Sequence, residues 1–347
     1  MTLQSSGAIS LLDIANEFGG STPHSLSEYY GVASGVPTSG NPISLDDFYG
    51  TSDITDASNE GNINGQANIK EATVSDYISS GGTFNIPANF WIWSDSVSTP
   101  ALIIDIPCTV TNSGNIIGKG GKGGNGQGTN YNVAQNGEDG GDAIKINSGV
   151  SNVTIINNSG AFIAGGGGGG GATQNGADDA GGGGGAGGGN GGYSDNNHTT
   201  NFGAGGQLNA SGDDATGNNS SQSGGEGGGR GGYAFENSSG SSYQSGGGGG
   251  GRILPASTQA AVTFGLNSLK DKGLGGGGGV AGGNGAEVGN SSRGAGGGGW
   301  GAAGGTGDSA TAGGQGGGSG GAAGKAIEDS GNTYTLTNNG TIFGATT

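Results

Sequence analysis

Residues 153–171 read VTIINNSGAFIAGGGGGGG, and this stretch joins the two patterns that decide the fold. A β-branched run, an Asn-Ser-Gly turn and a second short apolar run are followed at once by seven glycines. Short runs bounded by Asn, Ser and Gly predict strands with a tight turn between them. The same strand–turn–strand pattern occurs at residues 109–118 and 334–344. We therefore expect a small β platform that leads the chain into a glycine region and receives it again at the end.

The glycine region covers residues 164–325 and holds 65 of the 92 glycines of the 347-residue chain. Glycine makes up about 7% of ordinary proteins. Here it forms separate runs joined by polar segments, and we expect those segments to be loops between extended elements. The runs are residues 165–171, 181–192, 203–206, 224–232, 246–251, 275–283, 295–305 and 313–324.

Three structures compete for these runs. Ordering one glycine costs about 1–2 kcal/mol of backbone entropy, so composition alone favours a disordered linker. Collagen needs Gly at every third position with abundant Pro, and the chain has only 7 Pro, none of them inside the runs. Glycine helices of the polyproline-II type can instead pack at backbone distance and bond each N–H to a neighbour. The similar run lengths favour this third structure, in which Ala186, Val280 and Trp300 face outward or cap the stack.

The sequence outside the glycine region divides into three parts. Residues 1–52 repeat a Ser-x-x-acid pattern at 10–13, 25–28 and 44–47, which predicts three short helices with capping boxes. Residues 53–163 contain the strands of the β platform, with one helix expected over 70–78. The expected fold is therefore mostly β or irregular: a short N-terminal helical segment (1–52), a β-rich platform (53–163), a polyglycine-II bundle with variable loops (164–325) and closing strands (326–347).

Charge and composition exclude several classes of protein. The net charge is −17 and the isoelectric point is about 4.1, so we expect neither nucleic-acid binding nor attraction to an anionic membrane. The single cysteine, Cys108, rules out an internal disulfide framework and is expected to be buried. The N-terminus lacks the features of a signal peptide, and no run reaches the length of a transmembrane helix, so membrane insertion is not expected.

The sequence contains no pattern that predicts catalysis, a metal site or a cofactor. Its two histidines, His24 and His198, have no second His or Cys nearby to complete a metal site. Matches to the dinucleotide-binding glycine pattern arise by chance in such a composition and lack a surrounding βαβ unit. The acidic pairs at 138–139, 178–179 and 213–214 are interpreted as solvated loop charges, with weak Ca²⁺ binding as the alternative. We therefore expect a protein that binds rather than catalyses.

The stretch 153–171, with the alternating glycine runs and polar segments after it, resembles the distal tail-fibre adhesins of T-even-like bacteriophages. The resemblance covers roughly residues 100–347. It implies a polyglycine-II sandwich whose variable loops touch a receptor on the outer membrane of the host, and a location in the virion after synthesis in the host cytoplasm. Residues 1–50 resemble instead short segments in structural proteins of marine and cyanobacterial phages, so 1–52 is expected to dock onto other tail or fibre proteins.

If successive glycine runs go up and down, alternate loops share one end of the stack. Loops 193–202, 233–245 and 284–294 then lie together, and loops 172–180, 207–223, 252–273 and 306–312 lie at the other end. The apolar loop 252–273 is expected to cover the stack or the platform. The first set holds aromatic residues and an arginine, which are typical of binding hot spots. The expected receptor-binding residues are Tyr193, His198, Phe202, Tyr233, Phe235, Tyr243 and Arg293.

The expected function is recognition of a host outer-membrane protein or surface glycan through these loops. The alternative is a purely structural tail or baseplate component that binds no receptor. Two further classes are less favoured. An ice-binding bundle would need flat Thr or Ala faces, and a glycan depolymerase would need paired carboxylates in a groove.

Overall fold

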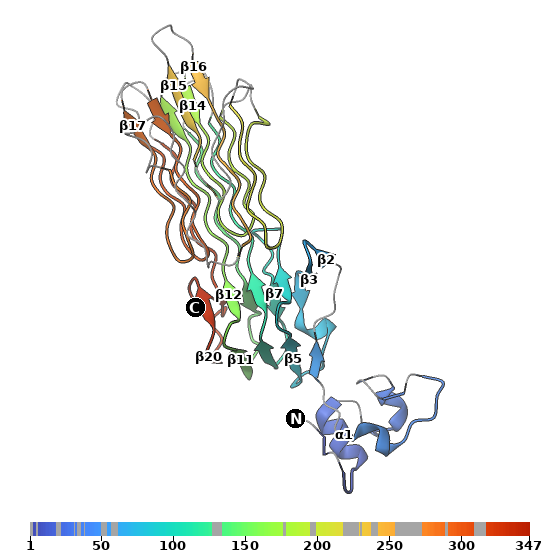
Figure 1. The fold of residues 1–347 in the computed structure, drawn as a ribbon. Coiled ribbons are helices and arrows are strands. Elements are labelled where there is room, and N and C mark those ends of the chain that lie inside the picture. The colour runs from blue at the N-terminus through green and yellow to red at the C-terminus, as the bar shows by residue number, and fades with distance from the viewer. Residues whose placement is uncertain are drawn as a thin grey trace.

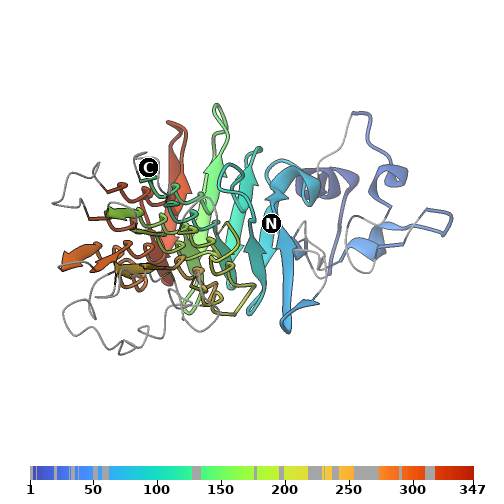
Figure 2. The ribbon, with the colours of Figure 1, turned by 90° about the horizontal axis from the view of Figure 1, so that it is seen from above.

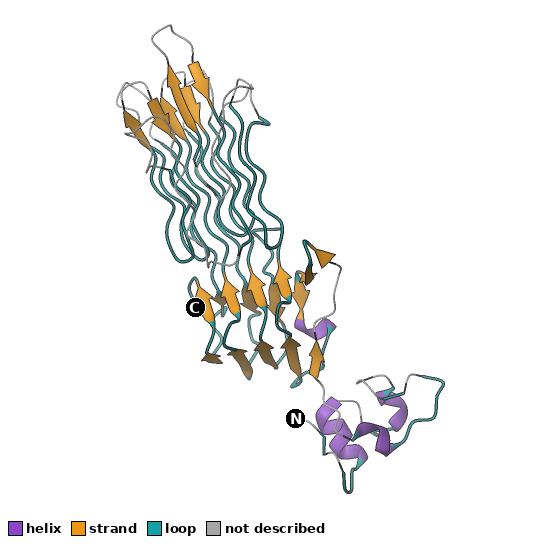
Figure 3. Ribbon diagram, in the orientation of Figure 1, coloured by secondary structure: helices purple, strands orange, loops and turns teal. Residues whose placement is uncertain are grey.

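A computed structural model of the chain describes residues 3–4, 6–18, 22–30, 32, 36–37, 39–49, 54–56, 62–126, 134–175, 178–194, 199–217, 229, 231–236, 242–253, 273–288, 291–308 and 317–347. Figure 1 shows a small helical segment at the N-terminus, a stack of strands beside it, and a long array of extended chain that leads away from the strands. Figure 3 shows that this array is irregular along its length and ends in a group of short strands at its far end.

The three helical segments lie where the Ser-x-x-acid repeat predicts them. They are α1 (Leu11–Phe18), η1 (Leu26–Tyr29) and η2 (Leu45–Phe48), the last two being 3₁₀-helices. Ser10 and Asp13 form a capping box at the start of α1, with Ser10 N–H donating to Asp13 Oδ2 at 2.8 Å and Asp13 N–H to Ser10 Oγ at 3.2 Å. Ser44 forms an equivalent capping box before η2. The segment before η1 has no side-chain cap.

These short helices are held together by one small apolar core. Ile14, Phe18, Tyr29 and Phe48 are buried in it, and the Phe48 ring lies 6.1 Å from the Phe18 ring and 6.2 Å from the Tyr29 ring between centroids. Helices of four to eight residues are unstable alone in water, so this shared core is what stabilises them.

The strand stack consists of three sheets whose neighbouring strands are parallel, apart from one antiparallel edge strand. The first sheet holds β1 (Ile54–Asp56), β5 (Thr83–Ile86), β8 (Thr109–Asn112), β11 (Val153–Asn157) and β20 (Tyr334–Asn338). The second holds β4 (Ala72–Thr73), β7 (Leu102–Ile104), β10 (Ile144–Ile146) and β19 (Ile327–Glu328). The third holds β3 (Gln66–Lys70), β6 (Trp91–Trp93), β9 (Asn115–Ile117), β12 (Phe162–Ala164) and β21 (Thr341–Phe343), with β2 (Asn62–Ile63) as the antiparallel edge.

The chain visits the third, second and first sheets in turn and then starts again, so the stack is a three-sided parallel β-helix. Each copy of the strand–turn–strand repeat supplies one strand to the first sheet and one to the third. Equivalent strands pair from coil to coil: Ile155 is in register with Val110 on one side and Leu336 on the other. The repeat in the sequence is therefore the coil repeat, and the closing strands at 326–347 belong to the same sheets as the platform.

The described interior of the β-helix is largely apolar and contains a line of asparagines. Val110, Ile155, Ile116 and Ile163 have no exposed surface. Asn112 Nδ2 donates to Asn157 Oδ1 at 2.9 Å, and Asn157 Nδ2 donates to Asn338 Oδ1 at 2.8 Å. Both Asn112 and Asn157 are fully buried, so this ladder satisfies amides that would otherwise be costly to bury.

Two details of this region bear on the predictions from sequence. Cys108 is buried, as predicted, and burial raises the pKa of its thiol to about 12. The helix predicted over 70–78 is wrong. The segment holds the end of β3, the strand β4 and the one-turn 3₁₀-helix η3 (Val74–Asp76). Glu71 turns the corner between the two strands with a φ of 57°, and pairing with β7 fixes β4 as a strand.

The glycine region is inserted at one corner of the β-helix. The chain passes from the third sheet to the second through a single residue after β3 and through residues 94–101 after β6. In the next two coils the connection at this corner is much longer: it spans residues 118–143 after β9 and residues 165–326 after β12. Because these corners are stacked, both excursions leave the β-helix side by side, and Gly121 N–H donates to Gly167 O at 2.8 Å. The platform thus feeds the glycine region and receives the chain back, as predicted.

Hydrogen bonds within the array follow a period of three. In the run that starts at Gly165, residues three apart donate to the same neighbouring segment, and successive residues donate to three different ones. The bonds are Gly166 to Gly141 and Gly169 to Glu138, Gly167 to Ala186 and Gly170 to Gly183, and Gly168 to Ala302 and Gly171 to Gly305, all at 2.8–3.0 Å. Each N–H is therefore satisfied by a neighbouring segment without forming a sheet.

The array is packed at backbone distance, which explains its glycine content. A Cβ on Gly168 would lie 2.0 Å from Gly321 O, and one on Gly169 would lie 1.9 Å from Lys122 O. Two of its larger side chains, Trp300 and Val280, lie at the margins. Trp300 is buried where the array meets the β-helix, together with Trp91 and Ile117, whereas Val280 is 58% exposed. The prediction that such residues cap the stack or face outward is confirmed for these two.

Several glycine runs are not single extended elements, contrary to the interpretation of the sequence. The run 181–192 folds back on itself at Gly187 and Gly188, which have φ of 103° and 78°, and Gly192 N–H donates to Gly182 O at 2.8 Å. The runs 275–283 and 295–305 fold back in the same way, at Gly279 and Gly301. Glycine adopts these left-handed conformations without steric cost, so a reversal inside a run leaves no mark on the sequence.

Candidate functional site

The far end of the array carries a cluster of short strands that we call the distal tip. A hairpin of β13 (Thr173–Asn175) and β14 (Asp178–Ala180) packs against a four-stranded antiparallel sheet in the order β16–β15–β18–β17. The strands of this sheet are β15 (Tyr233–Glu236), β16 (Ser242–Gln244), β17 (Ala286–Val288) and β18 (Ser291–Arg293). Figure 1 places the tip at the opposite end of the array from the β-helix and the N-terminal helices, and Figure 2 views the molecule along the array.

The distal tip brings together most of the residues predicted to bind a receptor. Phe235 is in register with Tyr243 across the β15–β16 pair, and Tyr233 with Arg293 across the β15–β18 pair. Tyr193 is half-buried, with Lys122 Nζ 5.4 Å from the centre of its ring. Phe202 is also half-buried. His198 lies outside the described residues.

Arg293 does not fit the prediction of an exposed contact residue. Its exposure is 2%, and its backbone O accepts a hydrogen bond from Thr173 Oγ1 at 2.7 Å. As the last residue of β18, Arg293 lies at the base of the tip, where the array becomes a sheet. Because the Arg293 side chain is buried at the base of the distal tip, it is not accessible to a macromolecular partner. The prediction that it binds the receptor is therefore wrong.

The prediction of which loops share an end is half correct. The described strands of 233–245 and 284–294 do share one end. Residues 216–217 of loop 207–223 lie at this end as well, contrary to the prediction, because Thr216 N–H donates to Asn201 O and Gly217 forms a bridge with Ser245. The turns at 207–210 and 252–253 lie at the other end, beside the β-helix, as predicted. However, segment 173–180 also lies at the distal tip, and Asp308 N–H reaches Thr173 Oγ1 at 3.0 Å. The error follows from counting runs that fold back as single elements. The remainder of the apolar loop 252–273, beyond Ile253, lies outside the described residues.

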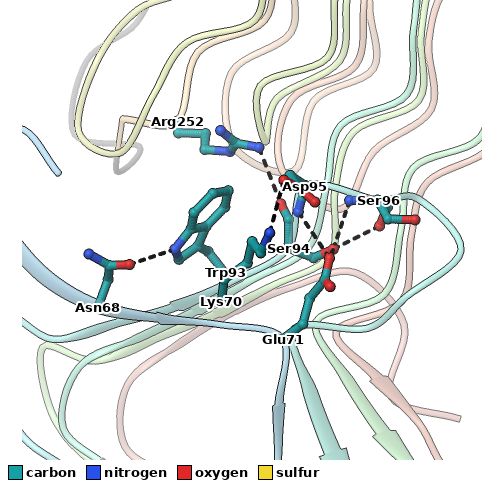
Figure 4. A network of polar contacts seen from close by, with 8 residues as sticks. All are labelled: Asn68, Lys70, Glu71, Trp93, Ser94, Asp95, Ser96 and Arg252. Atoms are coloured by element: carbon teal, nitrogen blue, oxygen red, sulfur yellow. Dashed lines mark hydrogen bonds and ion pairs between the residues drawn. The ribbon is translucent and has the colours of Figure 1, made fainter. Parts of the chain in front are cut away.

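Sequence reasoning missed a second polar site, where the array meets the β-helix (Figure 4). Arg252 lies over the Trp93 ring, with 4.8 Å between the guanidinium carbon and the ring centre. Its three nitrogens donate to carbonyl oxygens of Gly187, Gly206 and Ser94 at 2.9, 3.0 and 3.2 Å. The Arg252–Ser94 contact joins residues far apart in the sequence, so no local pattern could have predicted it.

Burial shifts the titration of two cations at this junction. Arg252 is 6% exposed, and burial lowers its pKa to about 10. Burial, followed by the neighbouring charge of Arg252, lowers the pKa of Lys119 to about 8. Lys119 Nζ donates to Gly188 O at 2.8 Å, so the two cations cap consecutive carbonyls of the turn at 187–188.

The described residues offer little for metal or membrane chemistry. No group of three or more His, Cys, Asp and Glu side chains within them is arranged to hold a metal ion. The acidic pair at 138–139 is used in the array itself, because Glu138 accepts from Lys122 N–H at 3.1 Å and Asp139 from Ala322 N–H at 2.6 Å. None of the helices in the described ranges has the length and apolar character to cross a bilayer.

A β-helix that carries a long glycine array with short strands at its far end suits a binding protein, and comparison with known proteins agrees. Residues 50–244 match the family described as phage tail fibre adhesin Gp38, which is more than half of the chain. The chain belongs to this family of bacteriophage tail-fibre adhesins, which are binding proteins rather than enzymes. Its location is accordingly the tail of a virion.

One solved structure is similar over the whole length. It is the gp37–gp38 adhesin tip complex of the long tail fibre of bacteriophage S16, with 21% sequence identity, a TM-score of 0.44, and coverage of 99% of this chain and 100% of that chain. No curated protein matches the sequence.

Proposed function

We propose that this tail-fibre adhesin recognises a host cell-surface receptor, an outer-membrane protein or a surface glycan, through the loops and strands of the distal tip. The observation that carries the proposal is the gathering of aromatic-bearing segments at the end of the array farthest from the N-terminal helices. Tyr233, Phe235 and Tyr243 come from strands of one sheet at that end. A tip at the end of a long rigid arm is the part of the molecule that meets a cell first.

The array favours this function because it fixes the tip without using side chains. Most of its hydrogen bonds join backbone groups, so the sequence of the connecting segments can vary with little effect on the packing of the array. Segments anchored at both ends need less ordering on contact, which limits the entropic cost of binding.

The test exchanges segments 193–202 and 233–245 for Gly/Ser sequences and measures adsorption of phage to host cells. We expect adsorption to fall by an order of magnitude or more, because aromatic hot spots each contribute about 2 kcal/mol or more. The control is Val280→Ser, which alters an exposed residue at the opposite end of the array. Unchanged adsorption of the exchanged protein would favour the alternative, a purely structural tail component.

We also propose that the glycine array is a polyglycine-II bundle. The period of three in its hydrogen bonds supports this, because polyproline-II helices have three residues per turn. Nuclear magnetic resonance couplings between amide and α protons measure φ directly. Values near −75° along 165–171 are expected for this helix, whereas values near −120° would indicate strands.

The N-terminal helical segment, residues 1–52, is proposed to dock onto other proteins of the tail or fibre. It lies at the opposite end of the molecule from the distal tip, and its helices form a core of their own. The match to the adhesin family begins only at residue 50, so this segment can attach the adhesin to a different fibre.

A further inference from the structure

A half-open cavity of about 290 Å³ lies at the junction between the β-helix and the glycine array. Ile63 and Leu208 form apolar parts of its wall, and Trp93 contributes an aromatic edge. Its polar lining comes from Asp95, Lys119, Gln207 and Arg252. These residues belong to three parts of the chain that only the folded structure brings together: the β-helix, the start of the first glycine excursion and the near turns of the second.

The cavity contains two cations that form no close ion pair within the described residues, although Asp95 acts on both of them and Glu138 on Lys119 from a greater distance. Arg252 and Lys119 both donate to backbone carbonyls, and neither forms an ion pair within the described part of the chain. The carboxylate in the lining, Asp95, pairs instead with Lys70 at 3.5 Å. Buried charges in proteins are normally paired, since removing a charge from water is costly. Two adjacent cations also repel each other.

We propose that this cavity binds a monosaccharide-sized ligand that carries an oxyanion, either a carboxylate or a phosphate. The oxyanion supplies the direct ion pair that Lys119 and Arg252 do not make within the described residues. Gln207 and Asp95 offer hydrogen-bonding groups for sugar hydroxyls, and Leu208 and Ile63 offer apolar contact. The volume is close to the lower end of the roughly 300–1,000 Å³ typical of ligand pockets, which suits an occupant of monosaccharide size. The site is separate from the distal tip and does not depend on the receptor-binding role proposed for it.

The cavity makes binding depend on pH. Lys119 faces Arg252, Asp95 and Glu138, and its pKa is lowered to about 8. A bound oxyanion favours the protonated form of Lys119, so the ligand and the proton bind together. Affinity therefore declines as the pH rises through about 8.

The experiment is calorimetric titration of the full-length protein with glucuronate, glucose 6-phosphate, inorganic phosphate and neutral glucose. We expect saturable binding of one or both acidic sugars, weaker binding of inorganic phosphate and none of glucose. The two acidic sugars distinguish the carboxylate from the phosphate. Lys119→Met should weaken binding about 10- to 100-fold, as expected for loss of a charged hydrogen-bonding partner.

Two further variants keep the outcome clear. Lys145→Met removes the same charge from an exposed position on the outer face of β10, and it should bind like the wild type. Lys119→Arg keeps the positive charge and should bind the acidic sugar. It serves as the test variant if Lys119→Met does not fold. The proposal is overturned if no acidic ligand binds at millimolar concentration, or if Lys119→Met and Lys145→Met bind equally well.

Discussion

At the scale of the residue, the decisive property is the missing Cβ of glycine. The array is held by backbone hydrogen bonds between segments whose carbonyl oxygens lie about 2 Å from where a Cβ would be, as at Gly168. Close backbone packing does not require glycine at every position. A Cβ on Gly277 would meet nothing within 4 Å. Gly168 and Gly277 therefore provide a matched test of whether close backbone packing explains the high glycine content.

Gly168→Ala should destabilise the protein strongly, because the methyl group must displace the backbone of the neighbouring segment. Overpacking typically costs about 1–3 kcal/mol, and a rigid backbone neighbour places this case at the upper end. Gly277→Ala should be neutral or stabilise by about 0.4–1 kcal/mol, because alanine restricts the unfolded chain. Thermal unfolding of the two variants measures the difference. Equal effects would contradict backbone-distance packing.

Side chains from one run also cap the amides of the next. Asn136, Asp139 and Asp142, each three residues apart, accept hydrogen bonds from the N–H groups of Ser319, Ala322 and Lys325 at 2.8, 2.6 and 2.7 Å. Burial raises the pKa of the Asp142 carboxyl, with the Lys325 N–H opposing that shift. A raised pKa means that the stability contributed by this carboxyl is present below its unfolded pKa and lost as the pH rises through the folded value.

Asp142→Asn should therefore be at least as stable as the wild type at pH 7, because the amide keeps the acceptor oxygen without the buried charge. The advantage should shrink as the pH falls towards 4, where the carboxyl of the wild type becomes protonated. Asp142→Ala loses the acceptor and should be destabilised by about 1 kcal/mol. Urea unfolding at both pH values tests this, and an Asn variant as unstable as the Ala variant at pH 7 would refute it.

At the scale of the element, the β-helix depends on equivalent positions in successive coils. The row Val110, Ile155 and Leu336 is in register along the first sheet, and the asparagine ladder runs beside it. The coils contribute two kinds of stabilisation: apolar burial along the rows, and amide bonds that only a correctly registered coil can make. A slip by one residue would turn each strand's inward residues outward.

Asn157→Ala should destabilise the β-helix more than its loss of volume implies, because the buried Asn112 amide loses one of its two acceptors and the bond from Asn157 Nδ2 to Asn338 Oδ1 is lost. Each lost hydrogen bond contributes about 1 kcal/mol. Thr154→Ala, on the less buried face of the same strand, is the control and should change stability by less than about 1 kcal/mol. Similar losses for both variants in urea unfolding would argue against the ladder.

At the scale of the whole molecule, the segment proposed for attachment and the tip proposed for receptor binding lie at opposite ends. The β-helix and the array form an arm with the N-terminal helices at one end and the distal tip at the other (Figure 1). Two large hydrophobic side chains are notably exposed among the described residues: Leu12 at 62%, on α1, and Val280 at 58%, in a turn of the array. The exposure of Leu12 fits a helical segment that docks onto a partner.

Leu12→Asp should reduce incorporation of the adhesin into phage particles by about tenfold or more, since charging an apolar contact costs at least about 1.4 kcal/mol. The variant should fold normally, because Leu12 lies opposite the buried face formed by Ile14, Ala15 and Phe18. Immunodetection of the protein in purified particles measures incorporation. Val280→Asp should be incorporated normally, and a similar loss for both variants would exclude a docking role specific to α1.

The sequence by itself determined the local elements. Ser/Asp pairs three residues apart determined two capping boxes, and the repeat at 109–118, 155–164 and 334–344 determined the paired strands of successive coils, since side chains specify both. Only the tertiary structure decided where glycine runs reverse, which segments share the distal tip, and that Arg293 is buried and Arg252 reaches Ser94. The physical reason is that glycine carries no side chain to mark a turn. The path of the array is fixed by backbone hydrogen bonds between distant segments, and these bonds exist only once the whole chain is in place.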